Sequence, residues 1–277
     1  MGVGRNRWIE VTAAIAWIAV IFCLVAQCVT EAAMQTPYSL LRDAISDLGA
    51  ARCTPQICSP WFRLVDASFV VLGLCLAVGG VLSHLSAPRD RLWWGAWAAT
   101  GALGMGGIGM AIIGFVPEDV HFRVHVGGAL AGLIGANVGA LFAGLALHRA
   151  RGHRVTGVTA VVVGAVGFLG SALSVLVFGK FLPALLGVGG GLERLGVWPL
   201  LGIMFLSGGA LLFGEDVLAK AYTSTRRFVS ARGRNQRDVA PASAQGVQVD
   251  LESLTTQLVD QLGEQKGQVV HNERRTP

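Results

Sequence analysis

Charged residues are scarce in this sequence. Asp, Glu, Lys and Arg together make up 14% of its 277 residues, whereas a soluble domain is usually nearer a quarter. Hydrophobic residues make up 53% of the chain, and its mean hydropathy is +0.58. So little charge argues against an ordinary soluble domain.

Long apolar stretches account for this scarcity, and Asp66 is the one charged residue within them. Apolar runs of about 18 residues or more are typical of helices that cross a membrane, whereas barrel strands are shorter and alternate in polarity. The runs are Val11–Val29, Leu64–Leu85, Leu92–Val116, Val124–Leu147, Val155–Phe178 and Val197–Phe213. The first run is too long for a signal-peptide core and lacks a convincing cleavage site. We therefore predict an all-α polytopic membrane protein, with six transmembrane helices within residues 1–216.

Basic residues alternate between rich and poor loops, which predicts the orientation in the membrane. The rich segments hold Arg5 and Arg7, then Arg89 and Arg91, then Arg149, Arg151 and Arg154, and finally five basic residues between Lys220 and Arg234. The pattern predicts that both termini are cytoplasmic in a multi-pass protein of the cell membrane. The net charge of +5 then follows from topology and attraction to anionic lipids, so a nucleic-acid partner is not required.

The composition changes after about Asp216. Residues 217–277 are polar and basic and have no extended apolar run, which predicts a mostly disordered cytoplasmic tail. Four leucines at helical spacing within this tail predict one short amphipathic helix near 248–263, a candidate contact for a protein partner or for the membrane surface.

Two cysteines and several glycine motifs also bear on the fold. Cys53 and Cys58 lie in the first outer loop, where an oxidising compartment favours a disulfide. Glycines 104, 106 and 109 match a GxGxxG spacing, but inside a membrane span they favour close helix packing over nucleotide binding. The stretch GVGGGLERLG at 187–196 is expected in the last outer loop, as a flexible hinge or as backbone that wraps a lipid phosphate.

Polar groups gather at the predicted outer ends of the spans. The break GFVPEDVHFRVHVGG places two acids and two histidines at one short turn, with the histidines four residues apart on one helix face. Ionisable groups at membrane depth usually face a bundle interior or a wet cavity. We expect an outward-facing polar pocket built from Arg42, Asp43, Ser46, Asp47, Asp66, Glu118, Asp119, His121, His125, Asn137, Glu193 and Arg194.

Each of these residues also has a structural interpretation. Glu118 and Asp119 suit a solvated helix cap at the positive end of a helix dipole. His121 could face headgroups, and Asp66 could pair with Arg63 or Arg194. His125 and Asn137 could satisfy hydrogen bonds between helices.

The order of these motifs resembles a known family. Four features, in this order, resemble the six-span family of domain of unknown function 998: ISDLG with following cysteines, a glycine-rich span that ends in G-x-x-P-E-D, a histidine at the start of span four, and an E-R pair before span six. The eukaryotic DRAM-type autophagy modulators are a more distant similarity. The resemblance implies a six-span fold and a polar site that includes Ser46, Asp47, Gly49, His125 and Glu193, without an established reaction.

Three functions are weighed. The first is a non-enzymatic membrane protein that engages lipid headgroups or a membrane partner. The second is a metal-dependent lipid hydrolase in which His121, His125, Asp47 and Glu193 hold a divalent transition metal. The third is an ion- or proton-coupled transporter, which would need charge deep in the bundle and often shows an inverted repeat. No certain cofactor follows from the sequence, and an enzyme is the less favoured interpretation.

Overall fold

The computed structural model describes residues 7–86, 94–148 and 154–213, all of which belong to one compact unit, Met1–Lys220. This described part is helical and contains no strand. Its α-helices are α1 (Arg7–Ala19), α2 (Ile21–Ala32), α3 (Phe62–Ser86), α4 (Trp94–Phe115), α5 (Phe122–His148), α6 (Arg154–Phe178) and α7 (Gly189–Phe213). The predicted tail at 217–277, with its amphipathic helix, lies outside the described residues.

Six segments of the described chain are long and apolar enough to cross a membrane. Helices α1 and α2 together form the first, Arg7–Ala32, and are separated only by Val20, whose carbonyl accepts a bond from the Cys23 N–H at 3.1 Å. The shortest of the six has 22 residues, which at about 1.5 Å per residue is enough for a hydrocarbon core of about 30 Å. The six-span prediction is confirmed.

The last span differs from its predicted limits. It begins at Gly189, whereas the apolar run begins at Val197, so the stretch expected to be a loop forms the first turns of α7. The N–H groups of Gly190 and Gly191 donate to the carbonyls of Arg42 and Leu41, at 3.2 and 2.8 Å. Backbone from the first loop thus caps α7, which corrects the expectation of a hinge.

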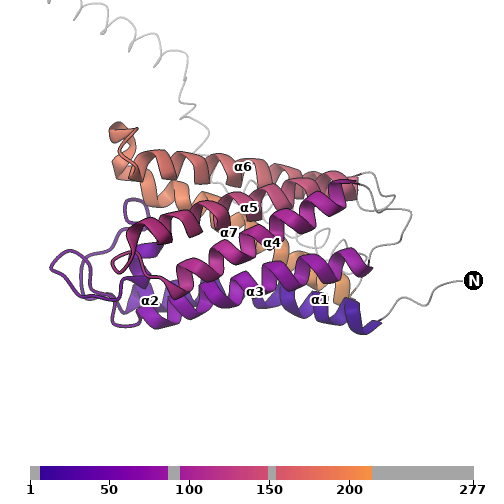
Figure 1. The fold of residues 1–277 in the computed structure, drawn as a ribbon, viewed down its shortest axis with the longest axis horizontal. Coiled ribbons are helices and arrows are strands. Elements are labelled where there is room, and N and C mark those ends of the chain that lie inside the picture. Colours follow the sequence, from indigo (N-terminus) through magenta and orange to yellow (C-terminus); the bar gives the residue numbers. More distant parts are fainter. Residues whose placement is uncertain (1–6, 87–93, 149–153, 214–277) are drawn as a thin grey trace, which may run out of the picture. The chain divides into compact units, whose positions relative to one another are not determined.

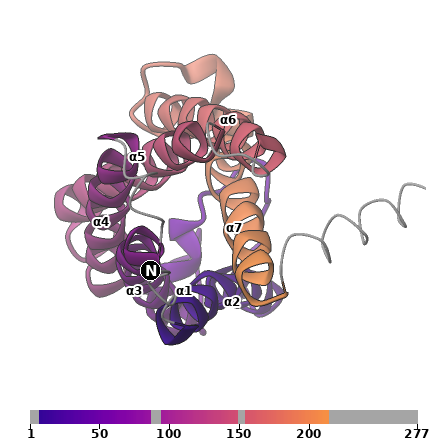
Figure 2. The ribbon, with the colours of Figure 1, turned by 90° about the vertical axis from the view of Figure 1, so that its right-hand side faces the viewer.

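The spans form a closed ring (Figure 2). Going round it, α1 packs on α3, α3 on α4, α4 on α5, α5 on α6, α6 on α7, and α7 closes the ring against α1. The buried side chains at its centre include Leu72, Leu76, Leu133 and Leu201.

Glycines set the closest approach in this ring. A Cβ added to Gly109 of α4 would lie 2.2 Å from the backbone nitrogen of Gly132 in α5, and one on Gly107 would lie 2.5 Å from the carbonyl oxygen of Gly73 in α3. Backbones in contact at these points leave no room for a side chain. Of the GxGxxG spacing, Gly106 and Gly109 therefore lie on a packing face, whereas a Cβ on Gly104 would meet nothing within 4 Å.

Three connecting segments meet at one end of the ring: residues 33–61, 116–121 and 179–188 (Figure 1). They contain two short 3₁₀ helices, η1 (Ser46–Gly49) and η3 (Pro183–Val188). We call this end the disulfide end, since it carries Cys53 and Cys58; α1 begins at the opposite end (Figure 1).

Candidate functional site

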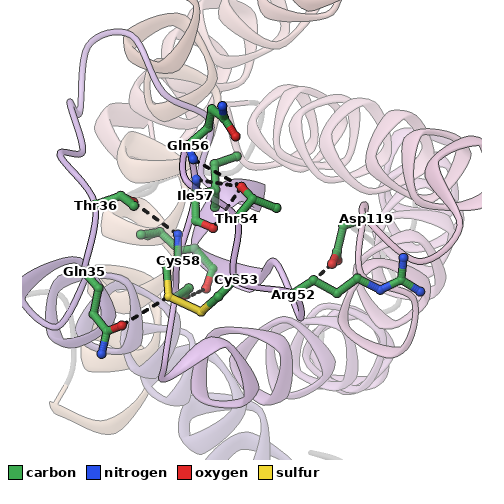
Figure 3. Close-up of a disulfide and its surroundings, with 11 residues drawn as sticks. Gln35, Thr36, Arg52, Cys53, Thr54, Gln56, Ile57, Cys58 and Asp119 are labelled. Carbon is green, nitrogen blue, oxygen red and sulfur yellow. Dashed lines mark hydrogen bonds between the residues drawn. A yellow bond between two sulfur atoms is a disulfide. The ribbon is translucent and has the colours of Figure 1, made fainter.

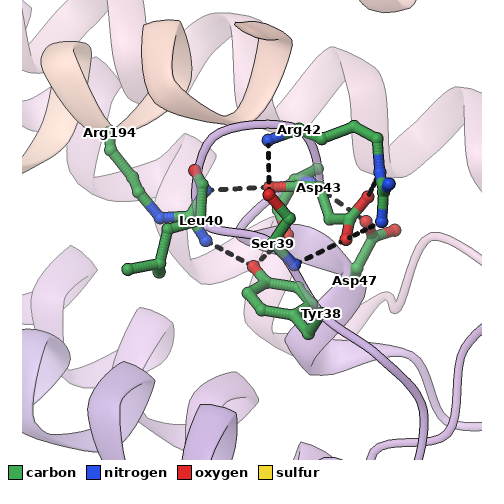
Figure 4. A network of polar contacts seen from close by, with 8 residues as sticks. Tyr38, Ser39, Leu40, Arg42, Asp43, Asp47 and Arg194 are labelled. Atoms are coloured by element: carbon green, nitrogen blue, oxygen red, sulfur yellow. Dashed lines mark hydrogen bonds and ion pairs between the residues drawn. The ribbon is translucent and has the colours of Figure 1, made fainter. Parts of the chain in front are cut away.

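Arg194 fastens the first loop to α7. Its Nη1 donates to the carbonyls of Leu40 and Asp43, both at 2.8 Å, and to that of Gly190 in its own helix at 3.0 Å (Figure 4). The side chain is only 4% exposed, and a buried guanidinium is costly unless its N–H groups find acceptors. Arg194 is thus bonded to loop carbonyls, and not to Asp66 as one alternative expected.

Aromatic rings surround the same guanidinium. Its carbon lies 5.5 Å from the ring centre of Tyr38 and 5.8 Å from that of Trp198, distances that suit cation–π attraction. Nη2 also donates to the Tyr38 hydroxyl, which donates in turn to the Ala44 carbonyl at 2.6 Å. Burial raises the pKa of Tyr38, so the hydroxyl keeps the proton that it donates.

Two of the predicted acids hold backbone N–H groups of the first loop. Glu193 Oε2 accepts from the Ile45 N–H at 2.8 Å, and the Asp119 carboxylate accepts from the N–H groups of Ala51 and Arg52 at 3.0 and 2.9 Å. Charge-assisted bonds of this kind are stronger than neutral ones. These acids therefore clamp the loop from α7 and from the α4–α5 turn.

A third acid, Asp66 of α3, packs directly under the same loop. It is 8% exposed, and a Cβ added to Gly49 would lie 2.5 Å from its Oδ1. Gly49 is the last residue of η1, and because it has no side chain, the loop backbone can pack directly against the Asp66 carboxyl group.

Asp47 and Glu118 form a carboxyl pair at this clamp. Asp47 Oδ2 accepts from the Ala44 N–H at 2.9 Å, and the Asp47 side chain also shares a hydrogen bond with Glu118. Burial, and then the neighbouring charge of Glu118, raise the pKa of Asp47 to about 8. Because two adjacent carboxylates repel each other, one proton held between them stabilises the pair.

The two histidines have different surroundings. His125 is 5% exposed, and its Nδ1 lies 2.7 Å from the Val116 carbonyl oxygen. A carbonyl can only accept, so Nδ1 carries the proton of this bond. His121, one residue before α5, is exposed. His125 thus ties α5 to the end of α4.

The metal-site alternative is not supported by this arrangement. Across the ranges that the structure describes, no three or more His, Cys, Asp or Glu side chains are grouped so that they could hold a metal ion. His121, His125, Asp47 and Glu193 are therefore not assembled as a ligand set, because Glu193 and Asp47 face loop N–H groups and His125 faces a carbonyl.

Asn137 lies deep in the bundle and joins three helices. Its Nδ2 donates to the carbonyls of Leu133 and Gly196, at 2.9 and 3.0 Å, and to the Ser171 hydroxyl at 3.4 Å. A Cβ on Gly167 would lie 2.0 Å from its Oδ1. Asn137 is fully buried and lies in the α5–α6–α7 contact, away from the loops of the disulfide end.

A cavity of about 420 Å³ opens beside the first loop. Of the predicted site residues, Arg42, Asp43 and Asp47 line it, while Ser46 is half-buried at the start of η1. The rest of the lining is less charged and gave no signal in the sequence: Met34, Thr36, Pro37, Tyr38, Gln56 and Ile57.

An ion pair forms part of the cavity wall. Arg42 Nε donates to Asp43 Oδ1 at 2.8 Å, and Arg42 Nη2 donates to Asp43 Oδ2 at 3.1 Å (Figure 4). Bonding to Arg42 lowers the pKa of Asp43 below its ordinary value. Oδ2 also accepts from the Ser39 N–H at 2.7 Å, which fixes the carboxylate in place.

A disulfide joins Cys53 and Cys58, as predicted from the sequence, next to the lining residues Gln56 and Ile57 in the chain (Figure 3). It closes a short loop in which the Thr54 hydroxyl accepts from the N–H groups of Gln56 and Ile57, at 3.3 and 3.1 Å. The Cys58 N–H donates to the Thr36 hydroxyl at 3.1 Å. The disulfide loop, with Gln56 and Ile57, is thereby joined to the segment that supplies Met34, Thr36 and Tyr38 to the cavity.

Most of the chain matches a protein family model. Residues 16–210 match the family model described as "Protein of unknown function (DUF998)". No curated protein and no solved structure matches the chain. The matched range runs from α1 into α7 and so includes every connecting segment of the disulfide end.

Proposed function

The chain belongs to the DUF998 family, a family of unknown function, and from this premise we propose that it is a non-enzymatic membrane protein that binds lipid headgroups in the cavity at its disulfide end. The cavity is the main support for the proposal, because its lining contains both polar and apolar side chains. Arg42, Asp43 and Gln56 offer polar groups, whereas Met34, Pro37 and Ile57 offer apolar ones. A lipid likewise combines a polar headgroup with apolar chains.

The position of the cavity supports a ligand drawn from the membrane. It lies among the segments that connect the spans, where headgroups meet the ends of transmembrane helices. Its volume of about 420 Å³ falls in the usual range for small-ligand sites, about 300–1,000 Å³.

The proposal includes an orientation. Both termini are cytoplasmic and the disulfide end faces outward, because the basic loops favour that topology and disulfides persist in oxidising compartments. The occupied leaflet is then the outer one of the cell membrane.

The other two functions gain no support from a particular contact. A hydrolase of the kind considered needs an assembled ligand set, which is not found among the residues described. A coupled transporter would need charged groups deep in the bundle. The deep candidate, Asn137, is uncharged; its Nδ2 donates to groups of its own and of two neighbouring helices, while its buried Oδ1 has no hydrogen-bond partner.

The test is to fill the cavity and count retained lipids. Gln56 lines the cavity with an exposed side chain, so Gln56→Trp should obstruct it without disturbing the core. His121→Trp is the matched control, since His121 is exposed at the same end and does not line the cavity. Lipids that remain bound after a delipidating detergent wash are counted by mass spectrometry.

We expect wild type and His121→Trp to retain the same number of phospholipids, and Gln56→Trp to retain at least about one fewer per chain. Circular dichroism checks that both variants keep the helical content of wild type. Equal retention by all three proteins would contradict the proposal.

A further inference from the structure

The charges in the cavity wall are balanced. Arg42 and Asp43 are neighbours in the chain and bond each other side by side, so one positive and one negative group face the same space. Asp47, the remaining acid of the lining, shares its hydrogen bond with Glu118, and its pKa of about 8 keeps it protonated near neutral pH. The lining thus has almost no net charge, although it is strongly dipolar.

Arg42 keeps donors for a ligand. A guanidinium has five N–H groups, and the bonds to Asp43 use one on Nε and one on Nη2. The side chain is 59% exposed, so the remaining N–H groups can reach a phosphate oxygen. Arginine recognises phosphate well because its planar fork matches two oxygens at once.

Asp43 keeps acceptor capacity beside these donors. Oδ1 receives one bond from Arg42, whereas Oδ2 receives two. An ionised carboxylate has about four acceptor positions, so Oδ1 retains one. Gln56 also lines this space, and a glutamine side chain carries an amide oxygen that can accept. A group with several N–H donors would satisfy both.

From these contacts we propose that the cavity selects a zwitterionic headgroup that carries a phosphate and a primary ammonium, as in an ethanolamine phospholipid. This inference rests on the proposed headgroup-binding function. The phosphate bonds Arg42, and the ammonium donates to Asp43 and Gln56. In such a headgroup two carbon atoms separate the phosphate from the ammonium, so its two charges lie close together, as those of Arg42 and Asp43 do.

Other headgroups fit less well on the same grounds. An anionic glycerol headgroup brings a phosphate without a cation and leaves Asp43 facing a negative ligand, because no second basic side chain lines the cavity. A choline headgroup has the right charges, but its quaternary ammonium has no N–H to donate. The predicted order of preference is ethanolamine, then choline, then glycerol.

The experiment is a competition between lipids. Purified full-length protein is equilibrated in mixed micelles that contain equal amounts of phosphatidylethanolamine, phosphatidylcholine and phosphatidylglycerol. After the same delipidating wash, mass spectrometry measures the amount and the headgroup composition of the retained lipid. The lipid retained by Gln56→Trp is subtracted as background, and the remainder is the lipid whose retention depends on an open cavity.

We expect wild type to enrich phosphatidylethanolamine at least about tenfold over phosphatidylcholine, because choline cannot donate the hydrogen bond to the charged carboxylate; tenfold corresponds to about 1.4 kcal/mol. Asp43→Asn keeps an acceptor for the Ser39 N–H and should retain lipid but lose this enrichment. Arg42→Gln should reduce retention of all three lipids. Arg63→Gln is the control, because Arg63 is exposed at the same end, lies over the Phe62 ring and does not line the cavity.

Failure of this inference is distinct from failure of the proposed function. If cavity-dependent lipid is retained in the proportions supplied, or is enriched in phosphatidylglycerol, the headgroup selectivity is wrong while lipid binding stands. If Asp43→Asn keeps the ethanolamine enrichment, the assigned contact is wrong. If Gln56→Trp retains as much lipid as wild type, the site itself is refuted, and the selectivity with it.

Discussion

At the scale of single residues, the acids of the disulfide end mainly organise backbone. Glu193 and Asp119 receive loop N–H groups, Asp66 lies against Gly49, and Asp47 bonds Ala44. Carboxylates placed in this way satisfy donors that would otherwise be buried without partners. The loop that forms the cavity wall is therefore held by charge-assisted bonds as well as by apolar packing.

The Asp47–Glu118 pair makes the hold on this loop depend on pH. The pKa of Asp47 is raised from 3.8 to about 8 in the folded protein, so between these values the folded state binds more protons than the unfolded one. Its contribution to stability is complete below about pH 4 and is lost as pH rises toward 8. We predict that the Ala44 N–H exchanges with solvent more readily as pH rises through this window.

Hydrogen–deuterium exchange, corrected for the intrinsic pH dependence, measures this effect. Because one proton is involved, the opening equilibrium should change by at most about tenfold per pH unit. Asp47→Asn keeps an acceptor for the Ala44 N–H but cannot titrate, so its corrected exchange should be flat over the same range. A wild-type profile as flat as that of Asp47→Asn would contradict the prediction.

At the scale of elements, helix α7 and the first loop depend on each other. The carbonyls of Leu41 and Arg42 accept hydrogen bonds from N–H groups in the first turn of α7. Arg194, in the second turn, donates to the carbonyls of Leu40 and Asp43 in the same loop. A Cβ on Gly190 would lie 2.1 Å from the Asp43 carbonyl oxygen. Gly190 is therefore required by the close approach of the loop backbone.

The α4–α5 contact supplies a test of glycine packing with an internal control. Gly109→Ala places a Cβ 2.2 Å from the Gly132 backbone nitrogen, whereas a Cβ on Gly104 meets nothing within 4 Å. We predict that Gly109→Ala lowers the free energy of unfolding by about 1–3 kcal/mol, the usual cost of overpacking. Gly104→Ala should leave it unchanged or raise it by up to about 1 kcal/mol, through helix propensity.

Thermal unfolding in one detergent, followed by circular dichroism, compares the two variants with wild type. Both changes add one methyl group to the same helix, so a difference between them reports packing and not composition. Equal stability of the two variants would show that α4 and α5 do not approach as closely as described.

At the scale of the whole molecule, six spans form a ring with a polar, loop-covered end. Basic residues favour the other end as the cytoplasmic one. We predict that a cysteine introduced at His121, which is exposed at the disulfide end, reacts with a membrane-impermeant maleimide in intact cells. A cysteine introduced at Ser243 in the tail should react only after permeabilisation.

The background for this labelling is Cys28→Ser, because Cys28 is the exposed free cysteine of the described chain, while Cys23 and Cys75 are buried. Labelling of the Ser243 position in intact cells, with the His121 position protected, would reverse the assigned orientation. It would also place the proposed lipid site at the inner leaflet.

The sequence by itself determined the number of spans, the grouping of polar residues near their ends and the disulfide. Hydropathy is a property of contiguous residues, and a cysteine pair separated by only 5 positions can close locally, so neither needs distant information. Family membership, too, follows from the sequence, since residues 16–210 match the family model.

Only the tertiary structure decided which groups these polar residues meet. Glu193 bonds the Ile45 N–H across 148 positions and Arg194 bonds the Leu40 carbonyl across 154, and their partners are backbone groups that every residue carries. Backbone partners of this kind cannot be recognised from the pattern of side chains. The sequence therefore predicted a polar pocket, but it did not predict that Glu193, Asp119 and Arg194 hold the first loop, or which residues form most of the cavity wall. The start of α7 was missed for the same reason, because its glycines and charged pair resemble a loop until the carbonyls of Leu41 and Arg42 cap the helix.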